Sequence, residues 1–385
     1  AHLRGQPLTW QLDDRGARWC GPAATAPRYR LARLATDPPK PGLVRVGPDT
    51  GTTIAGELWL ISTAMLGDFL AELPDPMALG RVTLADGSDV VGFGCALDAW
   101  HDGADITHHG DWRSYRRRVG PGIPATRPDV VNRRWRRRAL VVPGTTVDTT
   151  TDVEWLQAAR IYVDLRVPAG LAPVTATSPA ELTREDLLSM CQIQAFAGTL
   201  AVDGVEWTWH RDVDLHPAEP LPDRGRLHLA DGLLIETGLG RDYFEDWLPT
   251  PTDPASTSLE LALRDDSGRD GFLIRVGDRF GYARGRAAGD QPDGDRSLYQ
   301  SIATAGLDRG RALMDLEISL GTVAGAVWRI TSSTLPFRIG DDLSPEIVAG
   351  QSVSTAERGH DGTPLRRRWT VRSTVTATTG KDVPR

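Results

Sequence analysis

GRVTLADG, at residues 80–87, returns almost unchanged as GRLHLADG at residues 225–232, with six of the eight positions identical. The two similar stretches indicate either a duplicated fold or two different domains that use the same turn. In both copies, alternating apolar residues run into Asp-Gly, a dipeptide that tolerates the positive φ angles of a tight hairpin. The flanks differ, because a helical apolar pattern at 62–73 precedes the first copy and the proline-rich HPAEPLPDR precedes the second. The sequence therefore predicts one hairpin in each of two unlike domains.

The bulk composition is that of a globular protein. A chain of 385 residues, 40% hydrophobic and 25% charged, predicts two or three domains. The net charge of −7 gives no general attraction to nucleic acid or anionic lipid. No apolar run approaches the roughly 20 residues that span a bilayer, and no signal peptide is visible. The three cysteines are odd in number and widely spaced, which predicts reduced thiols in a cytoplasmic protein.

The first third of the chain carries short motifs in a recognisable order. They are AHLRGQPLTWQLDDRGAR (1–18), PPKPGLVRV (38–46), GRVTLADGSDVVGFGC (80–95) and DITHHGDWRSY (105–115). Together they resemble the C-terminal domain of allophanate hydrolase, whose fold is related to gamma-glutamylcyclotransferases. The resemblance covers residues 1–118 and implies a small α+β barrel with a pocket near the first motif.

The same resemblance implies an activity. In that family the domain is assigned the breakdown of N-carboxycarbamate to carbamate and carbon dioxide, after an upstream amidase with a serine–serine–lysine machinery has acted. The sequence shows no such machinery. The resemblance thus implies an enzyme that acts on a carbamoyl, urea-like or amide C–N substrate by decarboxylation or lyase-type breakdown, without its own amidase.

The AHLRGQPL loop supplies candidate residues for a small, planar, anionic substrate, which needs hydrogen-bond donors and a proton source. His2 and Gln6 are the candidate catalytic residues, since an imidazole transfers protons and an amide can bond the edge of an amide substrate. Arg4 and Arg45 are candidate ligands for a carboxylate, and Gly5 is expected to permit close backbone approach. The alternative, that His2 and Gln6 only satisfy backbone groups in an irregular loop, stays open.

Two other segments invite functional interpretations. HDGADITHHGD (101–111) holds potential metal ligands, but adjacent histidines point apart on a helix or a strand. We therefore expect surface polar residues, no metal and no cofactor. Ten arginines against one aspartate occupy residues 112–138, which predicts an arginine-rich linker over 119–138. The alternative, a nucleic-acid surface with interleaved aromatic rings, is disfavoured by the acidic net charge.

Beyond about residue 128 the chain becomes strand-dominated. A helix is predicted at 179–196, and alternating runs such as ALMDLEISL (312–320) predict strands. DTTTDVEWLQAARIYVDLRVP (148–168), FAGTLAVDGVEWTWHRDVDL (196–215) and LIETGLGRDYFEDW (234–247) resemble two-domain lipocalin-like proteins over residues 128–385. The resemblance implies tandem β-barrels at 139–250 and 251–385. The predicted fold class is mainly β with few helices, an α+β barrel at 1–118 followed by these two barrels.

The strand GVEWTWHRDVDL has an informative alternation. Its two-residue period places Trp207, Trp209, Arg211 and Val213 on one face and Asp214 on the other. The tryptophan face is expected to point into a barrel, and Arg211 would enter with it.

A buried arginine needs a carboxylate partner or an anionic ligand. Glu236 or Glu245 is expected to supply the carboxylate. One interpretation is a structural ion pair. The other is a ligand pocket formed by Trp207, Trp209, Arg211 and Glu236.

These observations leave an enzyme of the allophanate hydrolase C-terminal type as the first functional hypothesis. The alternatives are a non-catalytic lipocalin-like protein that binds a small apolar or acidic ligand, and an accessory module for a separate amidase. The expected partners are a small-molecule substrate or ligand and a separate amidase subunit, without membrane or nucleic acid. A homo-oligomer is left open.

Overall fold

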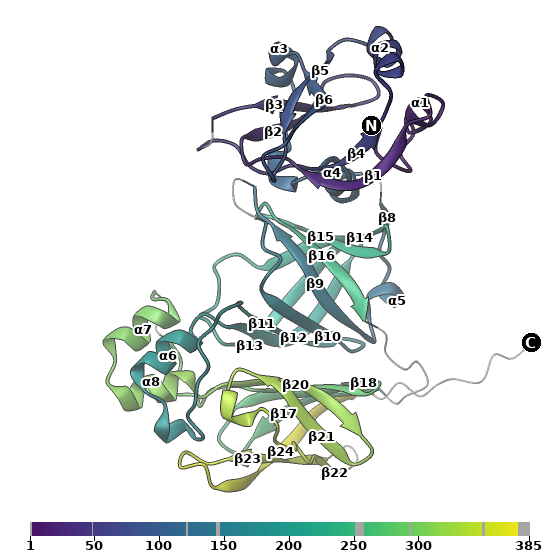
Figure 1. The fold of residues 1–385 in the computed structure, drawn as a ribbon. Helices are drawn as coiled ribbons and strands as arrows, with labels where there is room; N and C mark the ends of the chain where they lie inside the picture. Colours follow the sequence, from purple (N-terminus) through teal and green to yellow (C-terminus); the bar gives the residue numbers. More distant parts are fainter. Residues whose placement is uncertain are drawn as a thin grey trace, which may run out of the picture. The chain divides into compact units, whose positions relative to one another are not determined.

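The computed structural model describes residues 2–47, 49–120, 122–143, 147–250, 258–292, 295–348 and 351–375. The chain forms two compact units, Ala1–Gly122 with Val141–Val147 (unit 1) and Ile123–Leu140 with Asp148–Arg385 (unit 2). The architecture is mainly β, as expected from the sequence (Figure 1). None of the helices in the described part of the chain is long and apolar enough to cross a membrane.

Unit 1 combines short helices with small antiparallel sheets. Its elements are α1 (Trp10–Asp13), β1 (Arg18–Ala24), β2 (Tyr29–Arg33), β3 (Pro41–Arg45), β4 (Ala55–Leu60), α2 (Thr63–Ala71), β5 (Met77–Thr83), β6 (Asp89–Cys95), α3 (Leu97–His101), β7 (Ala104–Asp105), η1 (Thr107–His109) and α4 (Trp112–Val119). β1 pairs with β4, β2 with β3 and β7, and β5 with β6. The predicted α+β character is confirmed, but the described strands of this unit lie in separate sheets and do not close into one barrel.

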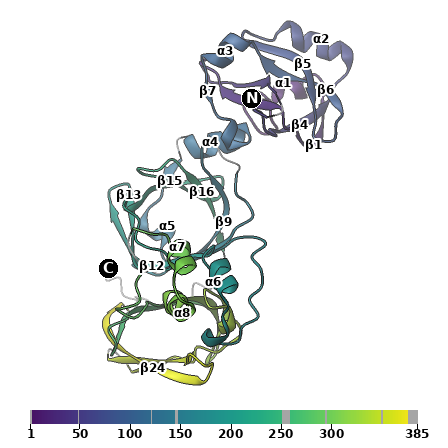
Figure 2. The ribbon, with the colours of Figure 1, turned by 90° about the vertical axis from the view of Figure 1, so that its left-hand side faces the viewer.

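Unit 2 begins with a closed barrel of eight strands. Its elements are β8 (Ile123–Pro124), α5 (Arg127–Val130), β9 (Arg133–Val141), β10 (Asp152–Gln157), β11 (Ile161–Val167), η2 (Pro179–Glu181), α6 (Arg184–Met190), β12 (Gln194–Asp203), β13 (Glu206–Asp214), β14 (Asp223–Ala230), β15 (Leu233–Gly238) and β16 (Phe244–Thr250). Each strand from β9 to β16 pairs with the next, and β16 pairs with β9. In Figure 2 these strands form a ring. We call this the first barrel.

The arginine-rich segment belongs largely to this barrel. Residues 133–138, predicted as part of a linker, lie in β9. Alternation explains the placement, because Trp135 enters the barrel while Arg134 and Arg136 point outward to Glu154 of β10. With their charges neutralised by neighbouring carboxylates, these arginines form a strand face and not a free basic surface.

The second barrel follows the same strand order. Its elements are β17 (Leu259–Asp265), β18 (Asp270–Val276), β19 (Arg279–Arg284), α7 (Leu298–Thr304), α8 (Leu307–Met314), β20 (Glu317–Ala324), β21 (Val327–Ser333), η3 (Pro336–Arg338), β22 (Glu346–Val348), β23 (Ser352–Arg358) and β24 (Pro364–Val375). β17 pairs with β24 as β9 pairs with β16, and both barrels carry helices between their third and fourth strands. The two barrels are therefore topological repeats.

The second barrel is a half-barrel because β21 and β22 do not pair. Leu343 bridges this gap with its backbone. Its N–H donates to the carbonyl of Trp328 in β21, and its carbonyl accepts from the N–H of Ala356 in β23. The predicted tandem barrels are thus confirmed in outline, as one closed barrel and one half-barrel.

One hydrophobic core joins the two barrels and the helices α6, α7 and α8. It gathers residues from the outer faces of both barrels, among them Leu156, Val163, Val213, Ile274, Ala283 and Ile318. The strands that supply them bury both faces, one inside their own barrel and one against this core. The ALMDLEISL run is correspondingly split, since α8 ends at Met314 and β20 begins at Glu317.

The two LADG stretches form hairpins in different units, as predicted. β14 and β15 are joined by Asp231 and Gly232, with φ angles of 51° and 77°, which is the combination that a type I′ turn requires. In the β5–β6 hairpin Gly87 has a positive φ of 86°, and Asp86 accepts a hydrogen bond from the N–H of Ser88 instead. The same letters therefore specify two different turns.

A close approach in the first barrel supplies a test of the fold. β13 carries one extra residue, Asp212, opposite Gly198 of β12. A Cβ atom at Gly198 would lie 1.9 Å from the His210 carbonyl oxygen. We expect Gly198→Ala to lower the free energy of unfolding by about 2–4 kcal/mol, since backbone must move. Gly289→Ala, where a Cβ meets no atom within 4 Å, is the control, and urea unfolding is the measurement. Equal stabilities of the two variants would contradict the described bulge.

Candidate functional site

His2 lies in a half-buried aromatic setting in unit 1. Its ring stacks on Phe93 of β6 with centroids 4.9 Å apart, and it meets Phe69 of α2 edge-on at 5.1 Å. Its Nε2 atom lies 2.5 Å from Oε1 of Gln11 in α1. With that oxygen as acceptor, the neutral ring carries its proton on Nε2 and leaves Nδ1 able to take up another. The imidazole is thus oriented, and one of its nitrogens remains available for proton transfer.

The electrostatic setting keeps His2 neutral. Burial lowers its pKa, and the charges of Arg15 and Lys40 lower it further, against the opposing effect of the Gln11 hydrogen bond. Arg15 is neutralised by Asp68 at 2.9 Å and Glu72 at 2.7 Å. Lys40 takes part in no ion pair within the described residues. Of these effects on the pKa of His2, that of Lys40 is the smallest.

Gln6 and Gly5 have local roles in the backbone of the first loop, and their roles towards a substrate stay predictions. Gln6 donates its backbone N–H to the carbonyl of Leu3 and to Oγ1 of Thr9, and the amide that contacts the imidazole belongs to Gln11. Gly5 has a φ of 75°, and a Cβ atom there would meet nothing within 4 Å. The glycine thus supplies a left-handed backbone conformation, and the close approach of a substrate to its backbone stays a prediction.

Arg4 lies in the loop before α1, whereas Arg45 is the last residue of β3. The guanidinium carbon of Arg4 lies 4.8 Å from the ring centroid of Trp19 in β1. Arg45 is exposed at the end of β3, where it pairs in register with Tyr29. No interaction among the described residues joins the two arginines, and their joint binding of a carboxylate stays a prediction.

The histidine pair at 108–109 is only partly a surface feature. His109 is 5% exposed because η1 turns it towards Tyr115 of α4, with ring centroids 5.4 Å apart. Burial, with smaller effects of His108 and Arg118, lowers the pKa of His109 to about 3. The expectation of a surface residue is wrong for His109. Across the described ranges no three His, Cys, Asp or Glu side chains gather as metal ligands would.

Indole rings fill one end of the first barrel. Trp207 and Trp209 are 1% and 6% exposed, as the alternation of β13 predicts. Trp155 meets Trp209 edge-on at 5.9 Å and Trp247 at 5.4 Å. An eight-stranded barrel has an interior just wide enough for side chains, so these rings form a packed core.

Arg211 also points inward, but its partners differ from those predicted. It donates to Asp223 at 2.5 Å and to Asp214 at 3.4 Å, and its guanidinium carbon lies 3.6 Å from the centroid of Phe196. The bulge at Asp212 is the reason, because one extra residue reverses the alternation. Asp214 therefore joins Arg211, and Val213 turns to the core between the barrels.

Glu236 and Glu245 face each other across β15 and β16. Glu245 accepts from Arg137 at 2.8 Å and from Arg166 at 3.0 Å. Glu236 accepts only from neutral donors in the described structure, Tyr243 Oη at 2.7 Å and Trp247 Nε1 at 3.1 Å. Burial and then the charge of Glu245 raise the pKa of Glu236 to about 8, so this carboxyl carries a proton at neutral pH.

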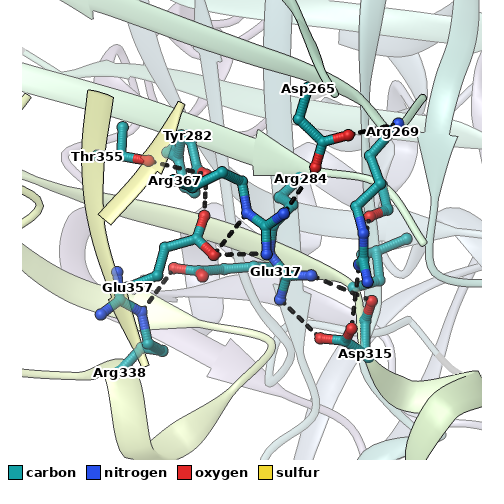
Figure 3. Close-up of polar contacts among 12 residues, drawn as sticks. Asp265, Arg269, Tyr282, Arg284, Asp315, Glu317, Arg338, Thr355, Glu357 and Arg367 are labelled. Atoms are coloured by element: carbon teal, nitrogen blue, oxygen red, sulfur yellow. Dashed lines mark hydrogen bonds and ion pairs between the residues drawn. The ribbon is translucent and has the colours of Figure 1, made fainter. Parts of the chain in front are cut away.

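The second barrel contains a buried ion-pair network, shown in Figure 3. Glu357 accepts from Tyr282 Oη at 2.6 Å and from Arg367 at 2.8 Å, and Arg367 also donates to Asp265 at 2.6 Å. The charged members in the described residues are Arg269, Arg284, Arg338, Arg358 and Arg367 with Asp265, Asp315, Glu317, Asp341 and Glu357. Five cations thus balance five anions.

Corresponding strand positions carry opposite charges in the two barrels. Glu245 and Arg367 each lie two residues before the buried tryptophan of the last strand. Glu245 pairs with Arg137 of the first strand, whereas Arg367 pairs with Asp265 of the first strand. Both barrels therefore have an ion pair between their first and last strands, but the positive and negative residues have exchanged strands. Each of these charges already has an oppositely charged partner within its own barrel, which favours the structural interpretation of these networks.

Sequence relatives cover the N-terminal unit. Residues 1–117 match the allophanate hydrolase C-terminal domain. A urea amidolyase from Lachancea kluyveri is 36% identical over 119 residues, which are 30% of this chain and 6% of that protein. A Kluyveromyces lactis allophanate hydrolase structure is 36% identical and covers 30% of this chain and 19% of its own, with a TM-score of 0.29. The structure of uncharacterized protein YLR301w from Saccharomyces cerevisiae is 14% identical, covers 63% of this chain and 98% of its own, and has a TM-score of 0.40.

The match to the allophanate hydrolase C-terminal domain confirms the resemblance read from residues 1–118. It also directs attention to residues of unit 1 that sequence reasoning missed. Gln11 and Lys40 both stand inside motifs of that resemblance; Gln11 contacts His2, and the charge of Lys40 has a small effect on the pKa of His2. The ion-pair network of the second barrel was not predicted. The two-residue alternation of RRRWTV (366–371) could have indicated it, because this alternation places Arg367 on the same face of β24 as Trp369.

Glu236 gives the first barrel a pH-dependent stability. Its pKa is raised in the folded state, so folding retains a proton that the unfolded chain releases above about pH 4.5. We expect this group to lower the free energy of unfolding by up to about 1.4 kcal/mol per pH unit between pH 4.5 and 8.

Glu236→Gln, which copies the protonated carboxyl, should remove that slope in urea unfolding measured from pH 5 to 8. Glu245→Gln is the matched comparison, since it takes the partner from two arginines and should destabilise the fold throughout. Identical slopes in the wild type and the Glu236 variant would exclude the protonated carboxyl.

Proposed function

We propose that unit 1 breaks the C–N bond of a small carbamoyl anion of the N-carboxycarbamate type, releasing carbon dioxide. The observation that carries the proposal is the setting of His2. A neutral imidazole is oriented by Gln11, shielded by Phe69 and Phe93, and influenced by the positive charge of Lys40. The match to the allophanate hydrolase C-terminal domain supports the class of substrate.

The chemistry requires one proton. Cleavage of the C–N bond leaves the bonding electrons on nitrogen, so the dianion plus a proton gives carbamate and carbon dioxide. His2 is suited to deliver that proton through Nδ1 while Nε2 stays bonded to Gln11. An anionic substrate beside the ring raises the pKa of His2, because it stabilises the imidazolium. The imidazole then takes up the one proton consumed in the reaction from hydronium or a buffer acid in the solvent and transfers it to the leaving nitrogen.

Charge complementarity supports the binding of an anion. Asp68 and Glu72 neutralise Arg15, whereas Lys40 has no ion-pair partner among the described residues and is a candidate to attract a carboxylate. Lys40 and Lys381 are the only lysines of the chain. An ammonium on a flexible stem acts as a point charge and adapts to a small ligand.

The proposal predicts that His2→Ala abolishes turnover. We expect a rate at least about 100-fold lower, the usual contribution of a positioned acid–base group. Substrate would be generated in place by a separate amidase acting on allophanate, and labelled carbon dioxide would be measured. His101→Ala removes an exposed histidine of α3 and is the control. An unchanged rate in the His2 variant would refute the proposal.

The role of Lys40 is tested separately. Lys40→Met should raise KM about tenfold, equivalent to about 1.4 kcal/mol of lost attraction, and should change kcat little, because the charge binds the substrate and its transition state alike. Arg18→Met removes an exposed cation of the same unit and should leave KM unchanged. Equal KM values for the two variants would contradict a specific role for Lys40.

A further inference from the structure

An ion pair between Glu57 and Arg113 forms hydrogen bonds with the backbone of the loop that carries His2. The N–H of Arg4 donates to Oε2 of Glu57 at 2.7 Å. The carbonyl of Arg4 accepts from the guanidinium of Arg113 at 2.6 Å. The same guanidinium pairs with Oε1 of Glu57 at 2.6 Å. Both hydrogen-bonding groups of one residue, two positions from His2, are thus held by a single carboxylate–guanidinium pair.

The two side chains of this pair come from elements that are themselves joined. Glu57 lies in β4, and its carboxylate is largely buried, with 13% of the side chain exposed. Arg113 lies in the first turn of α4, which Asp111 caps and in which Trp112 is buried. The N–H of Ala55 at the start of β4 donates to the carbonyl of Gly110 just before α4. The pair therefore stands on a frame that does not depend on the loop.

We infer that Glu57 and Arg113 are positioning residues for His2, which they hold against Phe93 and Phe69 through the backbone of Arg4. The inference rests on the proposed role of His2. Charge-assisted hydrogen bonds are shorter and stronger than neutral ones, and a catalytic group displaced by about 1 Å can lose about 100-fold in rate. The loop needs such support, because Arg4 and Gly5 are exposed and Gly5 has a left-handed conformation.

This inference assigns a role to the DITHHGDWRSY motif (residues 105–115), which contains Trp112 and Arg113. Trp112 anchors α4 in the core of unit 1, and Arg113 reaches from the helix to the His2 loop. An arginine suits this task because its planar fork can donate to a carbonyl and a carboxylate together. Arg116, one turn further along α4, is exposed.

The experiment compares Arg113→Met and Glu57→Gln with Arg116→Met in the full chain. Two readouts are needed, kcat and KM for the carbamoyl substrate, and the His2 ring nitrogens in long-range proton–nitrogen NMR spectra. The His2 signals are assigned by their loss in His2→Ala. Both clamp variants should lower kcat about tenfold with KM changed less than twofold. They should also turn the single Nε2–H tautomer of His2 into a mixture, and Arg116→Met should do neither.

The NMR signals of His2 test the positioning role, and turnover tests the proposed function. Unchanged His2 signals in both clamp variants would overturn the positioning role, whatever the effect on turnover. Altered His2 signals with an inactive wild type, or with His2→Ala as active as the wild type, would leave the positioning role standing and refute the proposed function. If Arg113→Met does not fold, Glu57→Gln decides, since it keeps the side-chain shape and removes only the charge.

Discussion

The desolvation of charged side chains is the constraint that organises unit 2. A carboxylate or guanidinium removed from water inside a barrel must find a partner or change its protonation state. In the second barrel, the described arginines and carboxylates balance and link the strands from β17 to β24. In the first barrel, Arg137 and Arg166 both form ion pairs with Glu245. Glu236 is left with neutral donors and retains a proton.

The barrels show how corresponding positions of a structural repeat can differ in sequence. They share strand order and the position of their helical insertions, but the ion pair between first and last strands has reversed its charges. The resemblance that the sequence does display, between residues 80–87 and 225–232, joins hairpins of unlike units. Turn residues repeat because few residue types tolerate positive φ, whereas paired charges can be exchanged without loss of the pair.

Unit 1 combines a recognised sequence with an arrangement that its motifs alone do not reveal. The match to the allophanate hydrolase C-terminal domain covers residues 1–117. The structure places the first motif against three other parts of that match. Phe93 and Phe69 enclose the His2 ring, and Arg113 with Glu57 holds the loop backbone. The motifs therefore act together, through contacts between residues up to 109 positions apart.

Three features could be predicted from the residues alone: the resemblance of residues 1–117 to the allophanate hydrolase C-terminal domain, the hairpins, and the inward face of Trp207 and Trp209. These depend on local order, turn chemistry and the two-residue period of a strand. The partner of Arg211, the contact of Gln11 with His2 and the raised pKa of Glu236 depend on the folded arrangement. A single bulged residue reverses the alternation of β13, and a loop can bring distant side chains to one imidazole. The pKa of a buried carboxyl is set by neighbours on other strands, which no spacing along the chain reveals.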